Sequence, residues 1–203
     1  MLGVALLAAI TPIAYLPFLQ ESNVIPQLFF LVGLWAIRAR KFWLVAVLVF
    51  AGTFAKETII FIIPFFFLSG WRPGRRWRAL TETGALAIIW GAAFIITRYG
   101  FCDGANSSLW QLPHNVSALA RYFSINPIIN PYIFYIPFFG ALWIMAFIKQ
   151  KQKPLFFQPV PAFVIIFMVA HFLFGWPQET RIILPLAFLV IPSSLMALFP
   201  KGE

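Results

Sequence analysis

Long apolar runs, separated by short polar or basic clusters, make up most of the chain. The runs cover residues 1–19, 24–37, 42–70, 79–97, 131–148, 156–175 and 182–199. Such runs are typical of helices inside a membrane, because a helix satisfies its own backbone hydrogen bonds where water is absent. The pattern predicts an all-α fold: one transmembrane helical bundle over residues 1–203, with about six spans and one re-entrant hairpin.

The predicted hairpin is the run 42–70, because the polar break Lys56-Glu57-Thr58 divides it. Each arm has only about 12 to 14 residues and reaches about 20 Å into a hydrocarbon core about 30 Å thick. Basic clusters at residues 38–41 and 72–78 flank the run, and such clusters favour the cytoplasmic side. We therefore expect both ends of the hairpin on that side and its turn inside the bilayer, where ionisable residues mark functional sites.

The remaining charges fix the expected sides of the other loops. Residues 20–23, 99–130 and 176–181 face outside in this topology, whereas the basic run 149–153 faces the cytoplasm. Apolar residues at helical spacing between Leu112 and Phe123 predict a short amphipathic helix on the outer membrane surface. In the same loop, Asn106 and Asn115 each begin an N-glycosylation pattern.

Composition supports a membrane protein independently of the pattern. Hydrophobic residues make up 62% of the chain and charged residues 10%, with a mean hydropathy of +0.88. A soluble fold of this length cannot bury so much apolar surface. The net charge of +9 comes largely from the predicted cytoplasmic loops, so it is a topogenic signal and needs no nucleic-acid partner. Cys102 is the single cysteine, which excludes an intrachain disulfide.

Outside the basic loops, the ionisable residues of interest gather at the hairpin turn and in two outer loops. They are Glu21, Lys56, Glu57, Glu179 and Arg181. The topology brings their segments toward one cavity that opens outward. A cavity that contains both carboxylates and cations suits phosphate chemistry: Lys56 and Arg181 would hold a phosphate, and Glu21 would bind a metal or orient a group.

Simpler interpretations of these residues stay open. Lys56 and Glu57 would neutralise one another at a helix break, and Glu179 with Arg181 would form an exposed loop pair of little energetic weight. Glu21 would then be an ordinary interfacial residue. A divalent metal is compatible with the site but is not required by it.

Three segments, in order, resemble bacterial GT-C class glycosyltransferases, the polytopic enzymes that use polyprenyl-phosphate sugars. Residues 18–22 (FLQES) resemble their Gln-Glu loop. Residues 51–58 (AGTFAKET), followed by Ile63-Pro64, are similar to their Gly-x-x-x-x-Thr/Ala-Lys/Arg-Glu/Gly-Thr segment. Residues 179–186 (ETRIILPL) resemble their late Glu-x-Arg-x-x-Leu-Pro segment.

The resemblance implies transfer of a sugar from a polyprenyl-phosphate donor to an acceptor on the outer face of a bacterial inner membrane. It implies a catalytic role for Glu21, and donor-phosphate binding by Lys56, Glu57, Glu179 and Arg181. Family members carry the presumed catalytic acids in a first outer loop that has no counterpart here. We therefore expect a fragment or a degenerate homologue, inactive as an isolated chain. The alternative is a non-catalytic membrane protein that binds or transports lipid, since broken helices also serve transporters.

Overall fold

The computed structural model describes residues 3, 5, 24–101, 111–113, 115–117, 139–175 and 183–199. Regular structure in these ranges is helical, without strands, which confirms the predicted all-α class. The chain divides into two compact units. Residues 20–106 form one, called the α2–α5 unit, and residues 1–19 with 107–203 form the other, called the α8–α10 unit.

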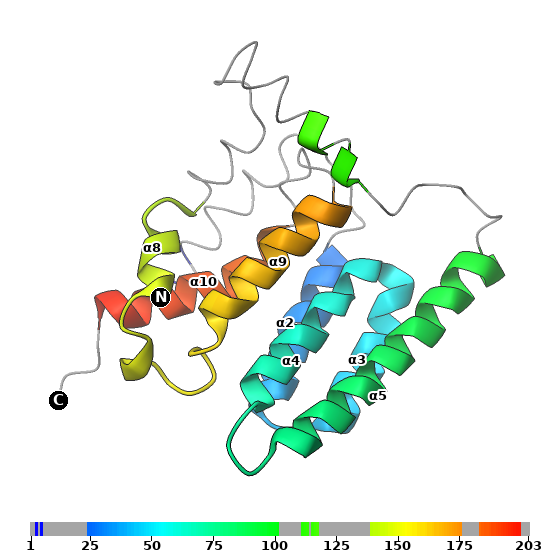
Figure 1. Ribbon diagram of the computed structural model, residues 1–203, viewed down its shortest axis with the longest axis horizontal. Helices are drawn as coiled ribbons and strands as arrows, with labels where there is room; N and C mark the ends of the chain where they lie inside the picture. The colour runs from blue at the N-terminus through cyan, green and yellow to red at the C-terminus, as the bar shows by residue number, and fades with distance from the viewer. Residues whose placement is uncertain are drawn as a thin grey trace. The chain divides into compact units, whose positions relative to one another are not determined.

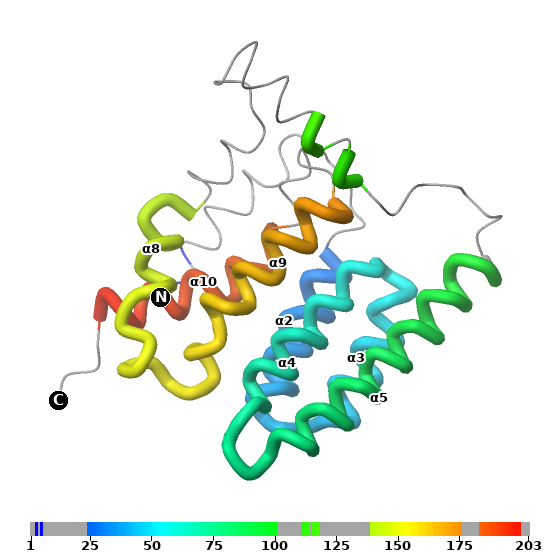
Figure 2. Tube along the Cα trace, viewed as in Figure 1, coloured from blue at the N-terminus to red at the C-terminus, as the bar shows by residue number. Residues whose placement is uncertain are grey.

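The α2–α5 unit is an antiparallel set of helices joined by short turns (Figure 1). Its elements are α2 (Val24–Arg38), α3 (Phe42–Ala55), the 3-10 helix η2 (Glu57–Phe61), α4 (Ile62–Gly70), α5 (Arg76–Ile95) and the π-helix η3 (Ile96–Phe101). Each helix reverses direction relative to the one before it. The end of α2, the start of α3, the end of α4 and the start of α5 therefore lie at one end of the unit (Figure 2).

Two left-handed residues make the reversals at this end tight. Arg40 has a φ of 55° between α2 and α3, where the N–H of Lys41 donates to Ala36 O (2.9 Å). Gly74 has a φ of 79° between α4 and α5, where glycine carries no steric cost. Both basic clusters of the sequence therefore share one end of the unit.

Small residues let the helices of this unit approach one another. A Cβ on Gly33 of α2 would lie 2.5 Å from Cδ1 of Ile62 in α4. On α5, the buried residues Ala79, Leu86 and Ala93 recur every seven positions, or two helical turns, so they lie on one face of the helix. The Phe42 and Phe66 rings meet at 6.1 Å between centroids and join the two arms near their basic end.

In the α8–α10 unit, α8 (Leu142–Phe147) packs against α10 (Leu184–Leu198), and α9 (Val160–Phe174) contacts both. A short 3-10 helix, η6 (Gln150–Gln152), lies in the basic loop that follows α8. Ser194 ties α10 to α8, because its hydroxyl lies 2.7 Å from Leu142 O. Pro192 lies inside α10.

The helices occupy the expected apolar runs, but most are short. In the described ranges one helix, Arg76–Gly100, is long and apolar enough to span a membrane: it has 25 residues, and an 18-residue stretch within it has a mean hydropathy of 1.7. Helix α2 has 15 residues, or about 22 Å, which is close to the length of an arm of the hairpin. The expected crossing by 24–37 therefore depends on residues before Val24, outside the described part of the chain. Six crossings remain a prediction.

Candidate functional site: the break in the hairpin

The hairpin turn is built around a single extended residue. Helix α3 ends at Ala55, and Lys56 has φ −165° and ψ 133°. Its N–H still donates to Gly52 O (2.9 Å), while its carbonyl accepts from the N–H of Ile59 (3.2 Å). The chain passes through Lys56 from an α-helix into a 3-10 helix, so the break predicted from Lys56-Glu57-Thr58 is confirmed.

Close backbone packing fixes this turn. A Cβ on Gly52 would lie 2.9 Å from Cγ1 of Ile59 and 3.4 Å from Cβ of Phe29 on α2. The neighbouring Thr53 is buried and donates its hydroxyl to Val49 O (2.6 Å). Glycine at position 52 thus lets η2 fold back onto α3, while Lys56 and Glu57 stay at the surface of the turn, half-buried and exposed respectively.

A tryptophan from α5 holds the other side of the turn. Trp90 Nε1 donates to Glu57 O (3.3 Å). The Trp90 ring stacks on Phe94 at 5.0 Å, and the guanidinium carbon of Arg98 lies 5.8 Å from the Phe94 centroid. Residues 90, 94 and 98 are four apart, so they form one stripe along α5 and η3, with Trp90 and Phe94 on α5 and Arg98 on η3.

The hydrogen bond from Trp90 to Glu57 O also shows how far along α5 the turn lies. Trp90 lies 14 positions after Arg76, or about 21 Å along the helix axis, and α5 with η3 continues for about 15 Å more to Gly100. Lys56 and Glu57 are therefore level with a point about three-fifths of the way along the helix long enough to cross a membrane. The arm length expected from the sequence, about 20 Å, agrees with this distance.

The structure brings together only part of the predicted site. Lys56 and Glu57 lie at the turn, as described. Glu21, Glu179 and Arg181 lie outside the described residues, so their predicted convergence on Lys56 stays a prediction. Within residues 24–101, Arg78 and Glu82 form an ion pair, with Arg78 Nε 2.8 Å from Glu82 Oε1.

Sequence reasoning missed Trp90 as a member of this site. A signal was present: an indole N–H in the middle of an apolar span needs an acceptor, and a helix break is where carbonyls become available. The described residues contain no group of three or more histidine, cysteine, aspartate or glutamate side chains arranged to hold a metal ion.

A second polar cluster in the basic loop after α8 was also not anticipated. Lys153, expected to be a cytoplasmic charge, is only 3% exposed. Its ammonium donates to Met145 O (3.2 Å), Ala146 O (2.8 Å) and Ser193 Oγ (3.0 Å). Burial lowers the pKa of Lys153 to about 8, whereas the carbonyls at the end of α8 favour its charged form. The geometry is that of a helix cap that joins α8 to α10.

Asn115 forms a similar cap at the end of α9. Its side chain is fully buried, and Nδ2 donates to Phe172 O (2.6 Å) and Gly175 O (2.8 Å). The N–H of Gln111 donates to Leu173 O (2.9 Å). The amide nitrogen that N-glycosylation would modify is thus used inside the folded unit. The described parts of the predicted amphipathic helix, 112–113 and 115–117, are helical, while Leu119, Phe123 and Asn106 lie outside the described residues.

In the part of the chain that the structure describes, these features define a helical arrangement with one candidate membrane span and a broken helical hairpin beside it. Comparison of the chain with known protein families, with curated proteins and with solved structures found no match. The function is therefore argued from the residues and the geometry of the turn.

Proposed function

We propose that this chain forms the membrane core of a glycosyltransferase that transfers a sugar from a polyprenyl-phosphate donor to an acceptor on the outer face of a bacterial inner membrane. The observation that carries the proposal is the break at Lys56, held against Trp90 partway along a helix that, among the described residues, is the one long enough to cross a membrane. An ionisable pair and an irregular backbone at that depth are costly unless they serve a polar ligand.

Lys56 supplies the charge for a phosphate at this turn. The Lys56 side chain makes no capping hydrogen bond to η2, which begins directly after it. A phosphate beside Lys56 would gain a charge-assisted contact in a setting partly screened from water, where such contacts are stronger than on an exposed surface. The stripe of Trp90, Phe94 and Arg98 on α5 and η3 would line the same side. Arg181 is the second cation proposed for the phosphate.

In the proposed reaction, the cations stabilise the departing donor phosphate while a carboxylate activates the acceptor hydroxyl. Glu21 is the carboxylate that the sequence offers for this part of the mechanism. Lys56 acts on the phosphate and takes no proton in this scheme. Its contribution is therefore measurable as donor affinity even without turnover.

Donor binding tests the proposal. The purified chain in nonionic detergent is titrated with a short-chain polyprenyl phosphate, and binding is followed by tryptophan fluorescence. The Lys56→Ala variant should bind roughly ten- to hundredfold more weakly, because a hydrogen bond to a charged group contributes about 1.5 to 3 kcal/mol. Lys56→Arg should retain much of the affinity, since it keeps the cation.

Two comparisons give the titration its controls. Lys151→Ala removes an exposed cation from the loop after α8 and should leave binding unchanged. A polyprenol of the same length, without phosphate, should bind wild type and Lys56→Ala alike. If the phosphate adds nothing to wild-type affinity, or if Lys56→Ala binds as wild type does, the turn is not a phosphate site and generic lipid binding is the better account.

A further inference from the structure

The end of the α2–α5 unit opposite the hairpin turn combines many cations with exposed tryptophans. We call it the basic end. Its cations are Arg38, Arg40, Lys41, Arg72, Arg75, Arg76 and Arg78. All are exposed except Arg72, which is half-buried. Along the α5 axis the basic end lies about 21 Å from the level of the Lys56 turn, so it is a separate surface.

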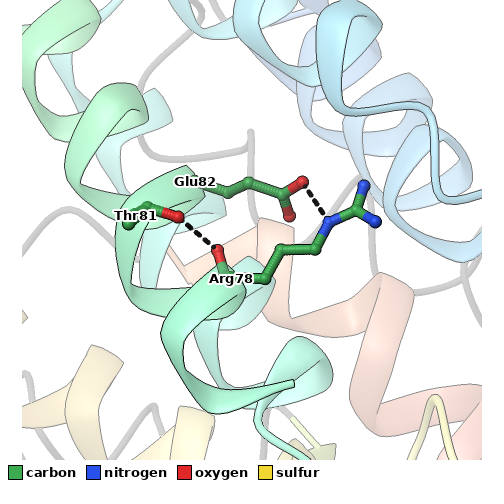
Figure 3. A network of polar contacts seen from close by, with 3 residues as sticks. All are labelled: Arg78, Thr81 and Glu82. Carbon is green, nitrogen blue, oxygen red and sulfur yellow. Dashed lines mark hydrogen bonds and ion pairs between the residues drawn. The ribbon is translucent and has the colours of Figure 1, made fainter. Parts of the chain in front are cut away.

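Glu82 lies near the basic end and pairs with one of these cations, so it leaves most of the positive charge there without an opposite charge. Glu82 accepts from Arg78 Nε at 2.8 Å, and the hydroxyl of Thr81 donates to Arg78 O at 3.0 Å (Figure 3). The contact uses Nε, so the two terminal nitrogens of Arg78 are turned away from Glu82 (Figure 3). Arg40 also sits in a left-handed conformation that glycine would adopt at lower cost. A cation is thus held at the tip of the turn despite that strain.

Four exposed tryptophans surround these cations: Trp35 at 54%, Trp43 at 65%, Trp71 at 42% and Trp77 at 82% exposed. Lys41 Nζ lies 5.1 Å from the ring centroid of Trp35, and the guanidinium carbon of Arg76 lies 5.5 Å from that of Trp71. Tryptophan favours the zone where lipid headgroups meet acyl chains, because its ring is apolar and its N–H is polar. The pairing of cation and ring is therefore suited to a headgroup layer.

The helix faces beside the basic end distinguish a lipid from a soluble polyanion. Leu31 on α2, Val47 on α3 and Leu80 on α5 are exposed large apolar residues within about three turns of it. A nucleic acid or an acidic protein would pair with the cations but leave these side chains in water. A phospholipid covers both, with its phosphate at the cations and its acyl chains along the helices.

We infer that the basic end of the α2–α5 unit binds anionic phospholipid headgroups of the phosphatidylglycerol type. The phosphodiester contacts arginines of the two basic clusters, the tryptophans flank the glycerol region, and the acyl chains lie on the exposed faces of α2, α3 and α5. This site is independent of the polyprenyl-phosphate site at the turn, because it uses other residues and other lipids.

The test uses the full chain, purified in nonionic detergent, and lipids whose acyl chains carry bromine, which quenches tryptophan fluorescence on contact. Brominated phosphatidylglycerol should quench at a lower mole fraction than brominated phosphatidylcholine. Raising NaCl from about 0.05 M to about 0.5 M should abolish the difference, since screening shortens the reach of the cations. Each cation removed should weaken phosphatidylglycerol binding about fivefold.

The variants are Arg75→Gln and the triple variant Arg40→Gln, Arg75→Gln, Arg76→Gln, with Lys151→Gln as the matched control in the other unit. The single variant should bind phosphatidylglycerol about fivefold more weakly than wild type, and the triple variant roughly a hundredfold more weakly. The control should bind it as wild type does. If the triple variant does not fold, the salt titration of wild type still decides. Equal quenching by both lipids, quenching that salt leaves unchanged, or displacement of phosphatidylglycerol by equimolar DNA would each overturn the inference.

Discussion

At the scale of single residues, polar side chains from one segment donate to backbone carbonyls at the helix ends of another. Trp90 bonds to the carbonyl at the start of η2, Asn115 to two carbonyls at the end of α9, and Lys153 to two at the end of α8. The last carbonyls of α8 and α9 have no partner within their own helix, and an unpaired carbonyl in apolar surroundings costs free energy. Lys153 and Asn115 therefore join segments within the α8–α10 unit, and Trp90 joins α5 to the hairpin within the α2–α5 unit.

The cap formed by Asn115 gives a direct stability prediction. Asn115→Ala should lower the free energy of unfolding by about 1 to 3 kcal/mol, because two buried carbonyls lose their donor. Asn115→Asp keeps the shape but turns a donor into an acceptor, so at neutral pH it should destabilise more. Part of that loss should return at low pH, where the protonated acid donates one hydrogen bond and protonation favours the folded state.

Thermal unfolding in detergent measures this prediction. Val116→Ala is the control, because it trims a neighbouring side chain that is half exposed. Its unfolding temperature should stay close to that of wild type. If Asn115→Asp is as stable as wild type at neutral pH, the amide is not donating to Phe172 and Gly175 and the cap is wrong.

At the scale of elements, glycines decide where the helices of the α2–α5 unit touch. Gly52 lies against Ile59 at the turn, and Gly33 lies against Ile62, whereas Gly84 on α5 has open space around its missing Cβ. All three sit in helices, where glycine costs about 1 kcal/mol relative to alanine. A Cβ at Gly52 or Gly33 would obstruct these contacts, whereas a Cβ at Gly84 would obstruct none.

The same glycine-to-alanine substitution at two positions separates the effect of helix propensity on stability from the effect of packing. Gly84→Ala should stabilise the chain by about 0.5 to 1 kcal/mol through helix propensity alone. Gly52→Ala gains the same propensity but forces Ile59 or Phe29 to move, so it should be less stable than Gly84→Ala by about 1 to 3 kcal/mol. Equal unfolding temperatures for the two variants would show that η2 does not fold back onto α3 at this point.

The sequence predicted these elements well where the signal was local. Apolar runs located α2, α3, α4, α9 and α10, and the charges at 56 and 57 located the break, because both effects act within one or two helical turns. The hydrogen bonds between distant segments were not predictable in the same way. Trp90 and Glu57 are 33 residues apart, and Asn115 and Phe172 are 57 apart. Only the folded arrangement brings such pairs together.

At the scale of the whole molecule, the central claim is that α3 and α4 form a hairpin that enters a membrane and returns, while α5 crosses it. Short arms joined at Lys56, basic clusters at both ends, and a 25-residue apolar helix beside them are its basis. On this proposal the Lys56 turn would lie inside the bilayer and face a donor, and the basic end would face anionic lipid. Convergence of Glu21, Glu179 and Arg181 on the turn stays a prediction from the sequence.

Labelling of single cysteines with a membrane-impermeant thiol reagent tests this claim most directly. In a Cys102→Ser background, Ala39→Cys and Pro73→Cys place the thiol at the two ends of the hairpin. Tyr99→Cys places it in η3, which continues α5, at a position where the side chain is exposed. The account predicts labelling at position 99 in intact bacterial cells, and at 39 and 73 only after permeabilisation. Labelling of position 73 in intact cells, with 39 protected, would mean that α3 and α4 together cross the membrane, and it would contradict the hairpin.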